Sequence, residues 1–255
     1  MKQHALAAKQ FGTTANAYLN SAVHAQGEDL QRLGDLAGRL KSSRALDLGC
    51  GAGHASFALA RAGSQVTAYD LSPEMLDVVN REANARRLSG IRTRQGSVES
   101  LPFANAAFDL VVTRFSAHHW LDVGAALREV RRVLRQQGTF VVIDVVAPES
   151  PLLDTVLQTA EILRDASHVR DYRRSEWSAM LQDAGFVAPE MSSWMLTMDF
   201  VPWVARMRTP ELRVQAIRDV FAHSAQEARD YFRLQADGSF DLPVAWMQTL
   251  SAVDV

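Results

Sequence analysis

The sequence has little of three things: cysteine, long apolar runs and excess charge. Its one cysteine, Cys50, excludes a disulfide within the chain and a cluster of thiolate metal ligands. No apolar run approaches the ~20 residues of a membrane-spanning helix, and residues 1–26 lack the continuous apolar segment of a signal peptide. With 27 Lys and Arg against 29 Asp and Glu, no overall field would attract a nucleic acid. These absences predict a cytoplasmic protein with no membrane span and no nucleic-acid partner.

The material for a buried core, in contrast, is ample. Hydrophobic residues make up 47% of the 255 residues, with only 8 Pro and 14 Gly, which excludes disordered and low-complexity classes. A chain of this length can form one α/β unit with embellishments, although roughly 150 residues per domain is typical.

Short apolar runs alternate with amphipathic stretches from Ala45 onward, which is typical of βαβ units. The predicted fold class is therefore α/β, with a doubly wound, Rossmann-like and mostly parallel sheet. We expect strands at residues 45–48, 65–69, 91–95, 108–113, 139–145, 194–201 and 242–250. We expect helices at residues 27–41 and after Ser72-Pro73-Glu74, Asp122, Ser175, Thr209-Pro210-Glu211 and the capping pair Ser224 and Glu227. The helix after Asp122 is expected to include Leu134 and to end before Gly138.

The most informative stretch is Ala45-Leu46-Asp47-Leu48-Gly49-Cys50-Gly51-Ala52-Gly53-His54, an apolar strand that breaks into a glycine-rich turn. Gly49, Gly51 and Gly53 permit positive φ and carry no Cβ, so a small molecule can lie against the backbone. The next predicted strand ends at Asp70, at the spacing typical of a carboxylate that accepts hydrogen bonds from ribose hydroxyls. The turn therefore predicts a site for an adenosine-bearing cofactor.

The third glycine position separates two kinds of cofactor. A dinucleotide fingerprint would place its last glycine at position 54, where this sequence has His54. A Cβ there obstructs the close approach that seats a pyrophosphate on a helix N-terminus. We therefore expect a cofactor without a pyrophosphate.

Further motifs follow in order: Tyr69-Asp70-Leu71-Ser72-Pro73-Glu74-Met75-Leu76, Gln95-Gly96-Ser97-Val98-Glu99-Ser100-Leu101-Pro102-Phe103, and residues 108–119. With the glycine turn, this series resembles the class I S-adenosylmethionine (SAM) methyltransferases over about residues 11–144. Within them it resembles the ubiquinone and menaquinone biosynthesis group, also described as methyltransferase type 11. The resemblance implies a seven-stranded sheet whose last strand is inserted antiparallel.

The resemblance also implies a set of cofactor contacts. The glycine turn, including Cys50, would hold the methionine part of SAM, and Asp70 the ribose hydroxyls. The remaining implied contacts are Leu71 and Met75 beside the adenine, Ser97, Val98 and Glu99 along its edge, and Arg114. Ser97 departs from the aspartate often found at its position, so a hydroxyl or a backbone carbonyl would replace that carboxylate. S-adenosylhomocysteine would be the product.

Because a sulfonium already activates the methyl group, the protein mainly has to align a small-molecule acceptor and exclude water. His118 and His119 follow the fourth predicted strand and are candidate general bases, while Tyr18 and His168 come from flanking segments. His119 in particular can instead be a hydrogen-bonded structural residue, and His168 can instead belong to a solvated helix end. Arg114 can alternatively hold an acceptor carboxylate or phenolate. No third ligand is spaced to complete a metal site with the two histidines, so no metal is expected.

The domain prediction is an N-terminal helical lid at residues 1–41 and a SAM-binding domain at residues 42–255. Segments near 147–175 and 201–238 would shape an acceptor pocket, and the apolar C-terminal third favours an apolar or ring-containing acceptor. In residues 203–210, Trp203 is expected to pack in the core, and Arg206 and Arg208 to lie on a solvated helix edge. Two alternatives stay open: a non-catalytic SAM-binding protein that retained the fold, and an NAD-dependent oxidoreductase.

Overall fold

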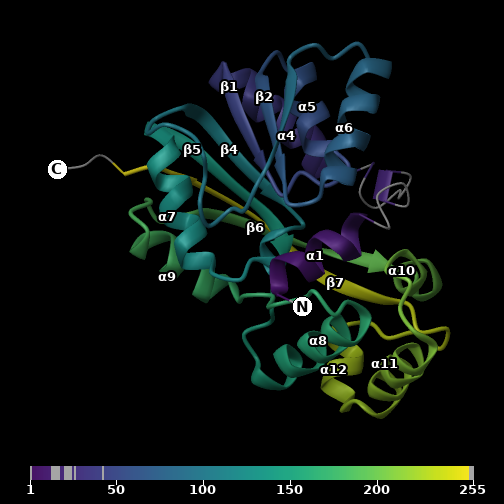
Figure 1. Ribbon diagram of the computed structural model, residues 1–255. Coiled ribbons are helices and arrows are strands. Elements are labelled where there is room, and N and C mark those ends of the chain that lie inside the picture. The colour runs from purple at the N-terminus through teal and green to yellow at the C-terminus, as the bar shows by residue number, and fades with distance from the viewer. Residues whose placement is uncertain (1, 13–17, 20–24, 26, 42, 253–255) are drawn as a thin grey trace.

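A single mixed sheet organises the chain in the computed structural model, which describes residues 2–12, 18–19, 25, 27–41 and 43–252 (Figure 1). The strands of the described chain are β1 (Arg44–Leu48), β2 (Gln65–Asp70), β3 (Ile91–Gln95), β4 (Phe108–Arg114), β5 (Leu134–Val145), β6 (Glu190–Met198) and β7 (Phe240–Leu250). Their order is β3-β2-β1-β4-β5-β7-β6, and β7 is antiparallel to both of its neighbours. The α/β class and the inserted antiparallel strand are therefore confirmed.

The helices of the described chain are α1 (Gln3–Gly12), α4 (Glu28–Leu40), α5 (His54–Arg61), α6 (Pro73–Ala85), the 3₁₀ helix η1 (Ala117–His119), α7 (Val123–Val133), α8 (Pro151–Arg164), α9 (Arg174–Asp183), α10 (Phe200–Arg206), α11 (Glu211–His223) and α12 (Gln226–Tyr231). Ser72 caps α6 by accepting a hydrogen bond from the Met75 N–H, and Asp122 caps α7 by accepting one from the Ala125 N–H. Both caps confirm the sequence-based prediction, because each supplies an oxygen to an otherwise unpaired N–H of the first turn.

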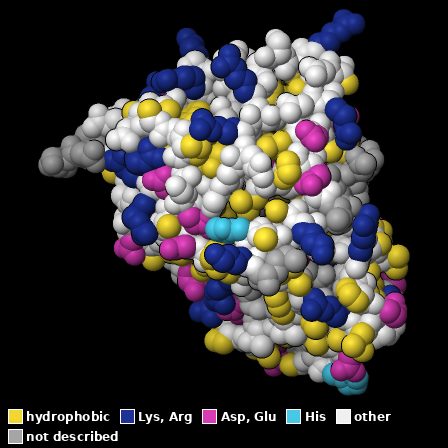
Figure 2. Space-filling model, viewed as in Figure 1, with side chains coloured by type: hydrophobic (Ala, Val, Ile, Leu, Met, Phe, Trp, Pro, Cys, Tyr) yellow, Lys and Arg dark blue, Asp and Glu magenta, His cyan; other side chains and the backbone are white. Residues whose placement is uncertain are grey.

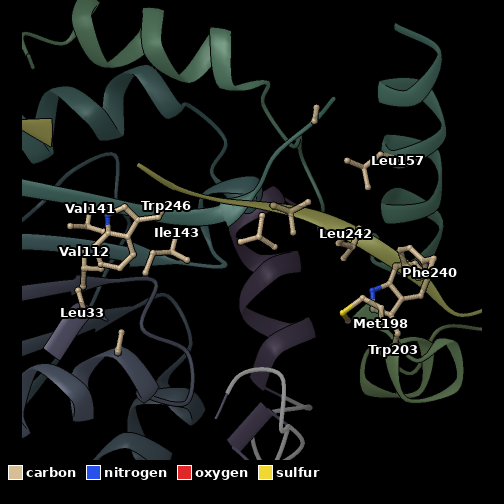
Figure 3. Packing of buried hydrophobic residues seen from close by; sticks show 14 of the residues in the cluster. Leu33, Val112, Val141, Ile143, Leu157, Met198, Trp203, Phe240, Leu242 and Trp246 are labelled. Carbon is tan, nitrogen blue, oxygen red and sulfur yellow. The ribbon is translucent and has the colours of Figure 1, made fainter. Parts of the chain in front are cut away.

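Alternation along the central strands gives the sheet two buried faces. Val112 and Ile143 belong to a core shared with α4 and α5, whereas Val111 and Val142 belong to the core under α7 and α9. The first core continues beneath the helices α8, α10, α11 and α12, which gather around the ends of β6 and β7 (Figure 1). Its two ends are visible in Figure 3, where the labelled residues are Leu33, Val112, Val141, Ile143 and Trp246 at one end and Leu157, Met198, Trp203, Phe240 and Leu242 at the other. Trp203 is fully buried there, as predicted.

The start of β5 differs from the prediction. Helix α7 ends at Val133, Leu134 begins the strand, and Gly138 lies inside it. The pairing of β4 with β5 is irregular between Phe108 and Leu110, and Gln137 takes up a left-handed φ of 58°. The strand thus continues through the expected turn, because the irregular pairing with β4 and the left-handed Gln137 accommodate Gly138 within the strand.

Three other boundaries also differ. The hydroxyl of Ser175 donates to Glu149 Oε2 instead of capping a helix, and α9 begins at Arg174, two residues before a helix capped by Ser175 would begin. Ser224 donates to the Val220 carbonyl at the end of α11, so the expected capping box does not form. The strand expected at residues 194–201 is β6, which begins at Glu190 and ends before α10.

On the face shown in Figure 2, Lys and Arg side chains are spread out with Asp and Glu side chains between them. In the part of the chain that the structure describes, no helix is long and apolar enough to cross a membrane.

Candidate functional site

The glycine turn joins β1 to α5 and contains three glycines with a left-handed backbone. The outer two positions require glycine for a different reason from the middle one. A Cβ on Gly49 (φ 64°) would lie 1.8 Å from the Ser116 hydroxyl, and one on Gly53 (φ 90°) would lie 2.9 Å from the Phe57 ring. A Cβ on Gly51 (φ 49°) would meet nothing within 4 Å. The two outer glycines therefore let the protein pack closely, while the middle one presents bare backbone to open space.

The carboxylate of Asp70 stands at the end of β2 and is tied to this turn. Its Oδ2 accepts from the Gly51 N–H over 2.9 Å, and its Oδ1 accepts from the Ser72 N–H over 2.9 Å. Burial raises the pKa of Asp70, while the backbone hydrogen bonds from Ser72, Gly51 and Leu71 oppose this rise. Each oxygen keeps a second lone pair, so the carboxylate can accept further hydrogen bonds from a ligand.

A cavity of about 970 Å³, here called the first cavity, opens at the carboxyl ends of β1, β2 and β4. This is the edge of an open α/β sheet where ligands bind. Predicted residues on its wall are Gly49, Cys50, Gly51, Asp70, Leu71, Met75, Val98, Glu99, Arg114, Tyr18 and His119. Two of the predicted cofactor residues, Gly53 and Ser97, are not on this wall; Ser97 donates to the Glu99 carboxylate instead.

Helix α1 covers one side of the first cavity through His4, Ala7, Ala8 and Phe11. Its contacts reach distant parts of the chain. His4 Nε2 lies 3.3 Å from Glu99 Oε1, and Gln10 donates to the Met207 carbonyl over 2.8 Å. The Phe11 ring also packs edge-on against His119, with 4.7 Å between centroids. The cavity is thus closed on this side by a helix held through a few side-chain contacts.

Asp47, in the motif that precedes the turn, was not predicted as a site residue. It is buried on the wall of the first cavity, and its Oδ2 accepts from the Ser56 hydroxyl over 2.6 Å. Among the residues that the structure describes, its Oδ1 has no hydrogen-bond partner. Burial raises the pKa of Asp47 to about 6. An unpaired buried carboxylate oxygen is costly, and it is free to accept a hydrogen bond from a donor group of a ligand.

A second cavity, of about 530 Å³, adjoins the first. The two share Tyr18, Phe115 and His119 as wall residues. The rest of the second cavity's wall consists of His118, Val145, Glu161, Arg164, Asp171, Leu196, Met198, Trp203, Arg206 and Leu242. Most of these come from β6, β7 and the helices of the 147–175 and 201–238 segments.

His118 is fixed by a carboxylate on the neighbouring strand. Its Nδ1–H donates to Asp144 Oδ1 over 2.6 Å, and the pair is almost completely buried. Burial opposes protonation, but the charge and hydrogen bond of Asp144 outweigh it and raise the pKa of His118 to about 9. At neutral pH His118 is therefore a cation on the wall of the second cavity rather than a base.

His119 has the opposite character. Its Nδ1–H donates to the Ser167 carbonyl over 3.1 Å. Burial and the charge of His118 lower the pKa of His119 to about 4. The imidazole is therefore neutral at pH 7, and it stands on the wall that the two cavities share.

Tyr18 and His168 occupy different places. The Tyr18 hydroxyl donates to Met207 Sδ over 3.0 Å on the shared wall, and burial raises its pKa. His168 is buried behind the second cavity, where its Nε2–H donates to Gln158 Oε1 over 3.0 Å. Burial, and then the charge of His118, lower the pKa of His168 to about 2, so it is neutral.

Arg114 lines the first cavity and pairs with α4. Its Nε donates to Asp29 Oδ2 over 2.5 Å, and both side chains are buried. Sequence reasoning missed Asp29 because nothing in the spacing between the residues links it to Arg114. In the described ranges, no group of three or more His, Cys, Asp or Glu side chains is arranged to hold a metal ion.

A doubly wound sheet, a glycine turn and an acidic strand end that wall one cavity define the architecture of the class I methyltransferases. A family model described as a methyltransferase domain matches residues 46–142. The chain belongs to the methyltransferase family, which the following relatives show.

YafE of Escherichia coli (strain K12), an uncharacterized protein, is 52% identical over 188 residues, covering 74% of this chain and 91% of YafE. The uncharacterized methyltransferase YcgJ of Bacillus subtilis (strain 168) is 37% identical over 222 residues, covering 87% of this chain and 88% of YcgJ. The crystal structure of YcgJ superimposes on this chain with a TM-score of 0.82 and 34% sequence identity. The superposition covers 88% of this chain and 100% of the YcgJ chain. A demethylmenaquinone methyltransferase of Chlorobaculum parvum (strain DSM 263 / NCIMB 8327) is 30% identical over 114 residues, or 44% of this chain and 45% of that protein. The resemblance to the quinone-biosynthesis group is thereby confirmed.

Proposed function

We propose that this chain transfers a methyl group from SAM to a small-molecule acceptor, with the cofactor in the first cavity and the acceptor in the second. The observation that carries the proposal is the wall that the two cavities share, formed by Tyr18, Phe115 and His119. A transfer reaction needs its two reactants side by side with water excluded. When bound, SAM supplies a methyl group already activated on a sulfonium.

The residues of the first cavity fit each part of that cofactor. Asp70 keeps free lone pairs for two ribose hydroxyls, and the unpaired Oδ1 of Asp47 suits the methionine ammonium. Leu71, Met75 and Val98 provide an apolar surface for the adenine. Arg114, already paired with Asp29, can hold the carboxylate of the methionine part.

The two adjacent histidines would divide the work on the acceptor. His119, neutral at pH 7, would take the proton that an acceptor hydroxyl or acidic carbon gives up. His118, held by Asp144, would donate a hydrogen bond to developing negative charge. Tyr18 would close the shared wall, and His168 supports the second cavity from behind through Gln158. The predicted cytoplasmic location and the lid role of residues 1–41 stay predictions.

The experiment is a calorimetric titration of the protein with SAM and with S-adenosylhomocysteine. Replacing Asp70 by Ala should weaken both about 100-fold, because two charge-assisted hydrogen bonds are lost. The control is Asp77→Ala, which removes an exposed carboxylate of α6. Absence of binding, or equal binding by Asp70→Ala, would overturn the proposal.

Turnover separates an enzyme from a non-catalytic SAM-binding protein. Incubation with SAM carrying a deuterated methyl group and a small-molecule extract should give products that contain the label. These products should be lost with His119→Gln, while cofactor binding is kept. Cofactor binding without any labelled product would favour the non-catalytic alternative.

A further inference from the structure

Arg206, at the last position of α10, does not lie on a solvated helix edge as its sequence context suggested. It is partly buried on the wall of the second cavity, whereas Arg208, two residues further on, is exposed as expected. The sequence prediction is therefore wrong for Arg206. The reason is that α10 packs against the end of β7 through Trp203 and Phe240, with ring centroids 4.9 Å apart, and this places the helix beside the cavity.

The other cationic groups on this wall, Arg164 and His118, are paired with carboxylates. Arg164 pairs with Glu161 over 3.3 Å and also donates to the Trp203 carbonyl over 3.1 Å. His118 is paired with Asp144. Burial raises the pKa of Asp171 well above its usual range, which favours its neutral form. Neither Arg164 nor His118 therefore leaves an unpaired cation on this wall.

Arg206 differs from the two paired cations. Its guanidinium lies 5.9 Å from the centre of the Tyr18 ring, and it forms no hydrogen bond or ion pair with any residue that the structure describes. Burial, and then the charge of Arg164, lower the pKa of Arg206. A guanidinium carries five N–H donors, so a partly desolvated one without an acceptor in the protein can bind a ligand that supplies oxygen atoms.

About half of the wall residues are apolar or aromatic without a charge, among them Val145, Leu196, Met198, Trp203 and Leu242. A ligand that satisfies both these residues and Arg206 must combine an apolar body with an anionic oxygen group. Protonated amines fit poorly, because Glu161 already has Arg164 as its partner and Asp171 is disposed to be neutral.

We propose that the second cavity selects an organic acid, an acceptor with an apolar body whose carboxylate or similar oxyanion is bound by Arg206. This inference rests on the proposed function, since it treats the second cavity as the acceptor site. Arg206 is accordingly a specificity-determining residue, and the first cavity is not involved in its contact.

The test uses three ligands with one carbon skeleton and different charges: phenylacetate, phenylacetamide and phenethylamine. Each is titrated at pH 7.5 into the 255-residue protein saturated with S-adenosylhomocysteine, and binding is followed by calorimetry and by saturation-transfer NMR. The variants are Arg206→Gln and Arg206→Lys, with Arg208→Gln as a control that removes an exposed charge at the same helix end. Separate titration of S-adenosylhomocysteine into each variant verifies that the cofactor site is intact.

Phenylacetate should bind the wild-type protein at least 10-fold more tightly than phenylacetamide, and phenethylamine should bind most weakly. Arg206→Gln should reduce the preference for the acid to about 1, Arg206→Lys should keep part of it, and Arg208→Gln should leave it unchanged. Equal binding of acid and amide, preference for the amine, or a preference that survives in Arg206→Gln would overturn the inference. If S-adenosylhomocysteine itself fails to bind the wild-type protein, the proposed function fails first, so the two failures are distinguishable.

Discussion

The Nδ1–H of His118 donates to Asp144 Oδ1 over 2.6 Å, and the same carboxylate accepts from the backbone N–H groups of Ala117 and Val145. One buried aspartate therefore fixes both the 3₁₀ helix after β4 and the imidazole that it carries. Because the pKa of His118 rises to about 9 in the folded state, the stability of the protein must depend on pH.

The first prediction concerns the pH dependence of this pair. Because the folded-state pKa is raised above the usual ~6.5, its stabilisation is complete below about pH 6.5 and is lost as the pH rises through about 9. His118→Gln should therefore lower the free energy of unfolding more at pH 6 than at pH 10, by on the order of 1–3 kcal/mol. Urea denaturation at both pH values measures this. The control, His223→Gln on the exposed face of α11, should show no such difference, and an equal loss at both pH values would contradict the prediction.

The second prediction separates two glycines of the same turn. Gly49→Ala should lower the free energy of unfolding by about 2–4 kcal/mol, because a left-handed Ala also collides with Ser116. Gly51→Ala should cost only about 1–2 kcal/mol of backbone strain, since its Cβ enters open space. Both variants should nevertheless lose binding of S-adenosylhomocysteine in calorimetry. Ser116→Gly should restore part of the stability of Gly49→Ala alone, and equal destabilisation by the two alanines would speak against this account.

The third prediction concerns Asp47. Its buried carboxylate destabilises the unliganded protein when ionised, and a role in cofactor binding would explain this cost. Its folded pKa of about 6 exceeds its usual value, so its contribution to stability is complete below about pH 4 and is lost as the pH rises through about 6. At pH 8, Asp47→Asn should be more stable than the unliganded wild type by on the order of 1–2 kcal/mol, yet bind SAM more weakly. Denaturation at pH 4.5 and pH 8, with calorimetry at pH 8, tests both statements.

Asp109 is a control for the third prediction, because its pKa is shifted in the direction opposite to that of Asp47. Burial tends to raise the pKa of Asp109, but hydrogen bonds from Ser43 and Arg44 and the charge of Arg135 lower it. Asp109→Asn should therefore destabilise the protein at pH 8 and at pH 4.5 alike, and this loss should shrink only as the pH falls below about 3.9. If both variants respond to pH in the same direction, the account of Asp47 is wrong.

The fourth prediction tests whether α1 acts as a lid. Its backbone N–H groups should exchange with deuterium about 10-fold more slowly when S-adenosylhomocysteine is bound, because the ligand adds contacts to a helix held by few side chains. Phe11→Ala should weaken the ligand about 10-fold, whereas Lys9→Ala, on the exposed side of α1, should not. Hydrogen exchange read by mass spectrometry checks the first statement, with α11 as the internal reference. Unchanged exchange in α1 would remove the lid role.

The first cavity was predictable because its signals are local in the sequence. Gly49 and Gly51 occupy a short turn, and Asp70 ends the strand that follows it, so spacing and strand order together place them at one edge of the sheet. The helix entries at Ser72 and Asp122 were predictable for the same reason. Boundaries that depend on a strand irregularity, such as the start of β5, were not.

The wall of the second cavity could not be predicted from the spacing of residues in the sequence. Glu161, Asp171 and Arg206 come from separate segments that only tertiary packing brings together. Asp144 is a partial exception, since it ends the strand beside the one that precedes His118, and neighbouring parallel strands end at the same edge. Sequence reasoning placed both histidines after β4 but could not tell that one is cationic and the other neutral.

The antiparallel strand β7 lies between β5 and β6, although it is the last strand of the described chain. During synthesis β6 has no partner in the sheet until residues 240–250 have been made, so this half of the sheet closes late. The first cavity draws its walls from residues 4–120, whereas the second needs Leu242 of β7. A growing chain thus acquires the walls of the first cavity well before those of the second.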